Sequence, residues 1–264
     1  MKMNLKTLAL LAALTATSHA TILDIARYRL GEAGSLGTNN RPKDSLSTDV
    51  FVADFLSGGT VSTDTAAPGS TESLIFGPAP SGHYSVGGNG VFGASSLGAT
   101  PDNFGIEMFV KATAGQGDNI FFSATGSDLS GGAGLIFELR GGNWGAAVPG
   151  NDWIGAIAGV GQTASADWTS LAVIRENGVS TFYINAVPQP RTTVAQPTFS
   201  GGFHLAVQSG GGQWFRGGMD ELHVFTFNPA TDNAASALTA VPEPSASLLL
   251  LGGLVTLARR RRSA

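Results

Sequence analysis

Apolar and polar residues alternate with a period of two on both sides of Asn177-Gly178, which predicts a β-hairpin over residues 170–187. An Asn-Gly pair between two such runs is a strong hairpin signal, because both turn positions need a positive φ. A two-residue turn also fixes which residues face each other. The predicted pairs are Leu171 with Ile184, Ala172 with Tyr183, Val173 with Phe182, and Ile174 with Thr181. Two of these pairs put large apolar side chains on one face, as a sheet with one buried face requires.

The rest of the chain carries short runs of β-branched and aromatic residues, separated by Gly, Asn, Asp and Ser. Few segments have the helical period, so the pattern predicts many short strands packed as a sandwich or barrel. The expected strands are 49–55, 74–76, 104–111, 120–124, 134–140, 203–208 and 219–227. Residues 229–241 are small and polar, which is typical of a linker.

The first 20 residues have the order of a secretory signal peptide. Lys2 and Lys6 form a short basic region, the apolar run from Leu8 to Ala16 follows, and Ser18-His19-Ala20 provides small residues at a cleavage site. We expect the Sec machinery to export the chain and cleavage to follow Ala20. The alternative, a buried N-terminal helix, does not explain why charge, apolar core and small residues come in this order.

The last 23 residues combine a short motif, an apolar stretch and a cluster of arginines. Pro242-Glu243-Pro244 precedes the apolar residues 245–258, and Arg259, Arg260, Arg261 and Arg262 follow. A helix over the apolar stretch would be ~21 Å long, against ~30 Å of bilayer hydrocarbon. The arginines would stay on the cytoplasmic side. We therefore expect a marginal anchor that holds the chain in the inner membrane only transiently.

The order of these three parts in residues 242–264 resembles the PEP-CTERM sorting signal. The resemblance implies that an exosortase cuts near the Pro-Glu-Pro motif and passes the protein to the surface of a Gram-negative bacterium. It also implies an association with exopolysaccharide. The alternative is a permanent tail anchor.

Removing the two ends changes the charge of the chain. Of 15 basic residues, two lie in the signal and four in the tail, which leaves nine; of 19 acidic residues, Glu243 lies in the tail, which leaves 18. The body therefore has a net charge of about −9, from 9 − 18. An acidic body without a basic stripe argues against nucleic acid as a partner. The chain has no cysteine, so disulfides and cysteine chemistry are excluded.

Four segments, in order, resemble laminin-G-like, concanavalin-A-like jelly rolls: residues 25–32, 104–111, 168–185 and 217–225. The second is similar to F-x-I-E-x-W-V-K, with Phe109 in place of Trp. The third is similar to W-x-x-L-A-V followed by F-Y-I-N, which gives Trp168 a core position. The resemblance implies an all-β fold, a two-sheet antiparallel jelly-roll sandwich over residues 21–228, with a signal peptide before it and an apolar helix behind it.

Two kinds of binding residue follow from this reading. Trp144 and Trp153 lie in a Gly-rich segment and are candidates to stack on sugar rings; the alternative is that they pack against the sandwich. In similar jelly rolls the aspartate of the closing strand can bind a structural calcium ion, so the resemblance makes Asp220 a candidate calcium ligand. Its alternative is a capped or paired aspartate. No other cofactor is expected.

Catalysis is not expected. Glycoside hydrolysis needs two carboxylates across the sugar, and jelly rolls similar to laminarinases carry alternating acids on one strand. Glu107 is followed by apolar residues, and we expect Glu107 and Glu138 on the solvated sides of their strands. The sequence thus predicts a non-enzymatic protein of the cell surface or extracellular matrix that binds glycan or protein. The alternatives are a glycoside hydrolase and a structural component without a ligand.

Overall fold

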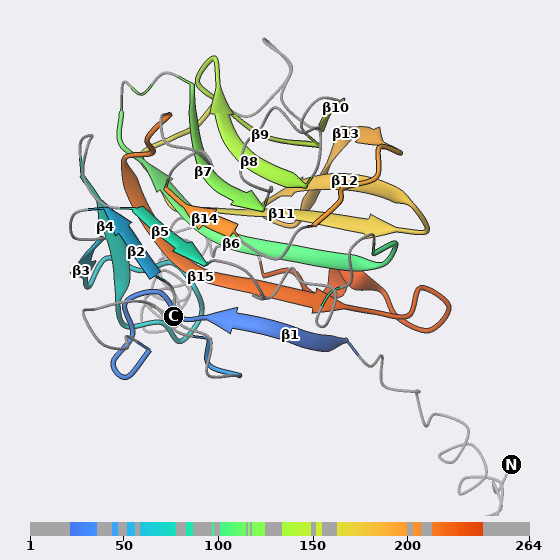
Figure 1. The fold of residues 1–264 in the computed structure, drawn as a ribbon, viewed down its shortest axis with the longest axis horizontal. Helices are drawn as coiled ribbons and strands as arrows, with labels where there is room; N and C mark the ends of the chain where they lie inside the picture. The colour runs from blue at the N-terminus through green and yellow to red at the C-terminus, as the bar shows by residue number, and fades with distance from the viewer. Residues whose placement is uncertain are drawn as a thin grey trace, which may run out of the picture.

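The computed structural model is a sandwich of two antiparallel sheets (Figure 1). It describes residues 22–35, 44–46, 52–55, 59–77, 83–86, 97, 101–114, 116, 118–124, 134–148, 152–154, 163–199, 203–206 and 213–239. One sheet has eight strands in the order β13-β12-β11-β6-β15-β4-β3, with β1 paired to β15; the other has seven in the order β10-β9-β8-β7-β14-β5-β2. The prediction of an all-β, two-sheet antiparallel jelly roll is confirmed.

The strand bounds follow the sequence pattern in most places. The eight-stranded sheet contains β1 (Leu23–Tyr28), β3 (Thr60–Ser62), β4 (Ser73–Phe76), β6 (Phe104–Ala112), β11 (Thr169–Glu176), β12 (Val179–Ile184), β13 (Val187–Thr193) and β15 (Gly217–Thr226). The seven-stranded sheet contains β2 (Val52–Phe55), β5 (His83–Val86), β7 (Asn119–Ala124), β8 (Leu135–Arg140), β9 (Asn143–Val148), β10 (Asp152–Ile154) and β14 (Phe203–Leu205). The alternation signal did not identify β3, β5, β9, β10 and β13, and β1 was indicated only by the family resemblance of residues 25–32.

The predicted hairpin forms in the predicted register. Strands β11 and β12 pair with Leu171 opposite Ile184 and Val173 opposite Phe182. The turn between them has φ +49° at Asn177 and +80° at Gly178, as a two-residue turn requires.

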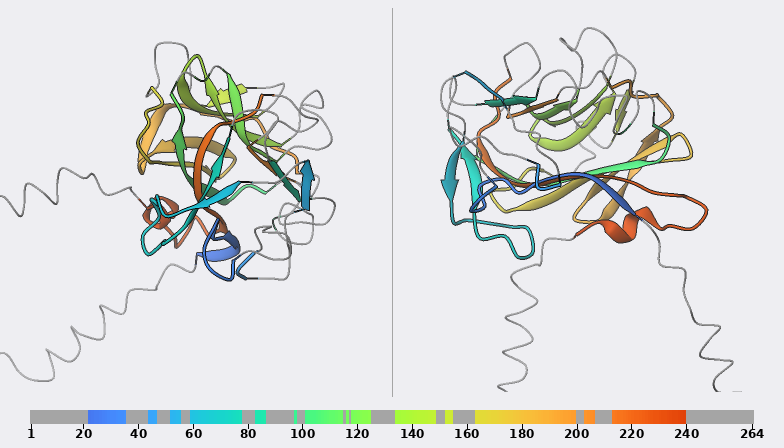
Figure 2. Two further views of the ribbon diagram at one scale, coloured as in Figure 1. Left: turned by 90° about the vertical axis from the view of Figure 1, so that its left-hand side faces the viewer. Right: turned by 60° about the horizontal axis from the view of Figure 1, so that its bottom comes forward.

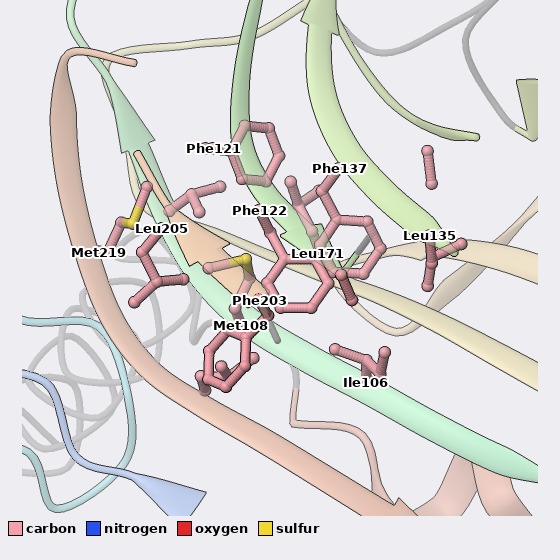
Figure 3. Close-up of a cluster of buried hydrophobic side chains, with 14 of the residues drawn as sticks. Ile106, Met108, Phe121, Phe122, Leu135, Phe137, Leu171, Phe203, Leu205 and Met219 are labelled. Carbon is pink, nitrogen blue, oxygen red and sulfur yellow. The ribbon is translucent and has the colours of Figure 1, made fainter. Parts of the chain in front are cut away.

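The core lies between the two sheets and is rich in phenylalanine (Figure 3). The Phe122 ring contacts Phe137, with ring centroids 5.4 Å apart, and Phe203, with centroids 5.9 Å apart. Alternate residues of β6, Ile106 and Met108 among them, point into the same layer. Each fully buried side chain of this size contributes about 1.5–3 kcal/mol. The chain has no disulfides, so this core must stabilise the fold.

Residues 228–239, which we call the C-terminal strap, are not a free linker. They include a short 3-10 helix, η3 (Ala234–Ala237), visible after β15 in Figure 2. The strap packs on the outer face of the eight-stranded sheet, where Ala234 joins Ile174, Phe225 and Phe227 in a separate apolar cluster. The linker prediction for 229–241 is therefore wrong up to residue 239. Small residues are typical of a linker, but here the alanines of the strap pack closely on the sheet.

The predicted signal peptide, residues 1–20, and the predicted sorting tail, residues 242–264, lie outside the described residues. Among the residues that are described, no helix has the length and apolar character needed to span a membrane.

Candidate functional site

Of the two tryptophans proposed to bind sugar, the structure describes the side chain of Trp144 only. Trp144 lies on β9 and is only 1% exposed, with its ring edge-on to Phe121 at a centroid distance of 5.5 Å. Neither ring face is open to a ligand, so Trp144 is a core residue and not a sugar-binding one. Residue Trp153 lies on β10 opposite Ala147, and its side chain is outside the described part of the structure.

Asp220 on β15 is fully buried and holds a loop. Its Oδ2 accepts the backbone N–H groups of Ala66 and Ala67, both at 2.9 Å, and its Oδ1 accepts the Ser70 hydroxyl at 2.9 Å. Burial raises the pKa of Asp220, while these hydrogen bonds oppose the rise. Asp220 therefore anchors residues 63–72 by hydrogen bonds, and we call this segment the Asp64 loop.

Glu32 supports the same loop from the N-terminal side. Burial raises its pKa, but hydrogen bonds from Ser70, Thr71 and Glu72 prevail and lower the pKa to about 2. The Thr71 hydroxyl donates to Glu32 Oε2 at 2.8 Å, and the Glu72 N–H donates to Oε1 at 3.1 Å. Two acids distant in sequence thus fix one short loop.

The donors around Asp220 do not suit a calcium ion. Calcium needs six to eight oxygen ligands, whereas two backbone N–H groups already point at Oδ2. Among the described residues, no group of three or more His, Asp or Glu side chains is arranged to hold a metal. The capped-aspartate alternative fits this environment better.

Glu107 and Glu138 are not on solvated surfaces, which corrects the expectation from sequence. They are 3% and 5% exposed, and burial raises their pKa values to about 7 and about 8. The neighbours of Glu107 on β6 and of Glu138 on β8 point into the core, so the two acids lie on opposite outer faces of the sandwich. Stacked sheets are ~10 Å apart, so these two acids cannot flank one glycosidic bond, for which the carboxyl groups must be ~5–9.5 Å apart.

A partly exposed aromatic side chain lies instead at Trp168, against Gly218 on the outer face of the eight-stranded sheet. The indole Nε1–H donates to Asp64 Oδ1 at 2.8 Å, and Lys111 Nζ donates to Asp64 Oδ2 at 2.7 Å. Hydrogen bonds from Lys111 and Trp168 lower the pKa of Asp64, so it is ionised at neutral pH. We call these three side chains the Trp168 platform.

The sheet itself positions the tryptophan. Gly218 on β15 is paired with Lys111 on β6 and with Ile75 on β4. A Cβ atom at Gly218 would lie 2.6 Å from Trp168 Cη2, so only glycine lets the indole lie this close to the strand. The ring orientation is thus set by the glycine beneath it and by Asp64 at its N–H.

Sequence reasoning missed this platform because the family resemblance gave Trp168 a core position. The core assignment of Trp168 is wrong: the residue precedes β11, is partly exposed and does not belong to the buried core. The Gly217-Gly218 pair at the start of β15 was the available signal, since glycine in a strand often marks a close approach of another group.

The chain belongs to the Laminin_G_3 family of the concanavalin A-like lectin/glucanases superfamily, whose model matches residues 58–231. No curated protein sequence matches the chain.

Solved structures share the fold at low sequence identity. Domain 4 of AbnA, an extracellular arabinanase from Geobacillus stearothermophilus solved with arabinotriose, has a TM-score of 0.50 and 17% identity, with 80% of this chain and 96% of that domain covered. The binding domain of botulinum neurotoxin serotype D has a TM-score of 0.52 and 10% identity, with 79% of this chain covered. The chain spans about half of that toxin domain.

Proposed function

We propose that this protein is a non-enzymatic, carbohydrate-binding protein that is exported to the cell surface or the extracellular matrix. The Trp168 platform is the observation that carries the proposal. An indole presents a flat apolar face to a sugar ring, and ordered polar groups beside it fix the orientation of the ligand.

The platform is preorganised for such a ligand. Asp64 fixes the indole and is itself fixed by Lys111, so little side-chain freedom remains to be lost on binding. The side chains of Lys111 and Asp64 are 33% and 48% exposed, which leaves polar atoms for sugar hydroxyls. The fold is compatible with this role, since the AbnA domain that shares it was solved with arabinotriose.

The test is a glycan array followed by calorimetry on any ligand found, with arabinotriose, β-glucans, alginates and sulfated galactans included. Replacing Trp168 by Ala should weaken binding by about 10-fold or more, which corresponds to about 1.4 kcal/mol. Trp168→Phe should lose less, because a ring remains to stack.

Val187→Ala on edge strand β13 is a matched control, since it removes an exposed apolar side chain away from the platform. A ligand whose affinity does not change in Trp168→Ala would place binding elsewhere and refute the platform.

One observation favours a hydrolase as the second candidate. Glu138 has a raised pKa, as a general acid needs, and the nearby Asp118 contributes to that rise. However, Asp118 Oδ1 accepts the Gly141 N–H at 2.7 Å and caps the turn between β8 and β9. If the wild type hydrolyses any glycan of the array and the Glu138→Gln variant does not, the hydrolase would be favoured over the binding protein.

Export and sorting complete the proposal. We propose that the Sec machinery exports the chain, that an exosortase removes the tail near Pro242-Glu243-Pro244, and that the surface partner is an exopolysaccharide. Mass spectrometry of protein from the native host should find an N-terminus at Thr21 and no arginine cluster. Recovery of the intact C-terminus from the extracellular fraction would refute the processing step.

A further inference from the structure

The end of the C-terminal strap is held by one buried carboxyl group. Glu107 Oε1 accepts the backbone N–H of Thr239 at 2.8 Å and the Ser170 hydroxyl at 2.8 Å. Glu107 lies on β6 and Ser170 on β11, so the strap is fastened at the centre of the eight-stranded sheet. Thr239 is the last described residue of the chain.

The charged groups around Glu107 are committed to other partners. Glu107 pairs with His223 of β15 on one side and with Ala172 of β11 on the other, and His223 in turn pairs with Arg27 of β1. These residues form one row across the sheet. His223 Nε2 lies 2.8 Å from Asp24 Oδ1, and Arg27 Nε lies 2.7 Å from Glu221 Oε1. Tyr183 continues the row beyond Ala172 and belongs to the apolar cluster under the strap. No described cation forms an ion pair with Glu107 itself.

A carboxylate in this position is costly to ionise while the strap is docked. Burial raises the pKa of Glu107 to about 7, although hydrogen bonds from Thr239 and Ser170 lower it; Glu221 raises it and Arg27 lowers it. Lifting the strap would expose the carboxyl group to water and return its pKa towards the ordinary value of 4.5. The docked state therefore holds the proton more tightly than the released state.

We propose that residues 228–239 form a releasable latch, which stays docked while Glu107 is protonated and opens when Glu107 ionises. Docking is strongest below about pH 4.5 and weakens as the pH rises from about 4.5 to about 7. The largest possible change in the docking equilibrium is about 300-fold, from a difference of about 2.5 pH units.

The apolar contact of the strap is small enough for this change to matter. It consists mainly of Ala234, Ala235, Ala237 and Leu238, packed on Ile174, Phe225 and Phe227. An opened strap would be an arm of about 12 residues, up to ~40 Å long when extended. Pro242 follows Thr239 by three residues in the sequence, so opening the latch would lengthen the segment between the sandwich and the Pro-Glu-Pro motif by about 12 residues.

The absence of cysteine from the sequence allows a direct test by thiol labelling of the full-length chain in detergent. Ala234→Cys places a thiol at a site that is 3% exposed under the docked strap, and Ser236→Cys places one at an exposed site of the same strap. The ratio of the two labelling rates cancels the intrinsic pH dependence of thiol reactivity. We expect this ratio to rise at least 10-fold between pH 5.5 and pH 8.5.

Two further variants separate latch opening from unfolding. Ala146→Cys, in the fully buried core, reports global unfolding and should label far more slowly than Ala234→Cys at both pH values. Glu107→Gln keeps an acceptor for the Thr239 N–H but cannot ionise, so the pH dependence of the ratio should disappear. A flat ratio in the wild type, a rise that persists in Glu107→Gln, or parallel labelling of the core thiol would each overturn the latch.

Discussion

The carboxyl group of Glu138 should make the protein less stable as the pH rises. It lies on the outer face of the seven-stranded sheet, paired with Ile120 and Gly145, and its Oε1 has no hydrogen-bond partner within the described part of the chain. Burial is the main cause that raises the pKa to about 8, Arg140 opposes the rise and Asp118 adds to it. An unpartnered, buried carboxylate is unfavourable once it loses its proton.

The magnitude follows from proton linkage. Below pH 4.5 the carboxyl group is protonated in both states, so it contributes nothing to the pH dependence. Between 4.5 and about 8 only the folded protein keeps the proton, so the free energy of unfolding falls as the pH rises. Three and a half pH units at about 1.4 kcal/mol each give an upper value of about 5 kcal/mol. Local relaxation around the carboxylate reduces this, and we expect about 2–5 kcal/mol.

Urea unfolding of wild type and Glu138→Gln at pH 4, 6, 7 and 8.5 tests this directly. The amide cannot ionise, so the two proteins should have similar stability at pH 4, and the variant should be more stable by about 2–5 kcal/mol at pH 8.5. Glu107→Gln is a matched variant on the opposite face and should remove a separate part of the pH dependence. A stability difference between wild type and Glu138→Gln that is the same at pH 4 and pH 8.5 would refute the reasoning.

Three further changes have defined outcomes. Gly178→Val puts a β-branched residue at φ +80° and should lower stability by about 1 kcal/mol or more. The matched variant Gly178→Asn should cost less, because asparagine tolerates a positive φ. An unchanged melting temperature for the Val variant would show that the turn is not strained by the substitution. Trp144→Ala should destabilise by about 3–5 kcal/mol and leave glycan affinity unchanged in protein that remains folded, which calorimetry at low temperature can check. Chelator should not change the melting temperature, because N–H donors occupy Asp220; a fall that added calcium reverses would show a cation site.

Period-two alternation predicted the side chains that face the core better than it predicted the environment of the side chains on the outer faces of the sandwich. It gave the β11–β12 register because Asn177-Gly178 permits one tight turn and a slip of one residue would expose every core side chain. It missed β9 because glycine and alanine dominate residues 141–147, so no alternation of large apolar residues marks that strand. Alternation can show that Glu107 faces away from the core, but it cannot show that the strap then covers that face.

The candidate site was less predictable than the fold for a related reason. The platform joins Asp64, Lys111 and Trp168, which are far apart in sequence, and no local motif links them. A family pattern indicates that a tryptophan occurs before β11, but the exposure of its ring depends on the neighbouring strand and on the Asp64 loop. Only the register of β15 with β6, which sets Gly218 beside Lys111, shows where the indole lies.

On the outer face of the eight-stranded sheet, two buried acidic side chains accept hydrogen bonds from backbone N–H groups and so fix the segments that cover the sheet. Along β6, Glu107 fastens the strap, and Phe109 pairs with Asp220, which fastens the Asp64 loop. Lys111, two residues further on, belongs to the platform that this loop completes. Glu107 and Lys111 are four residues apart on one strand, or ~13 Å, so a ligand of several sugar units on the platform would reach towards the strap. A ligand long enough to do so should bind with a pH dependence that Glu107→Gln removes, whereas a single sugar on the platform should show none.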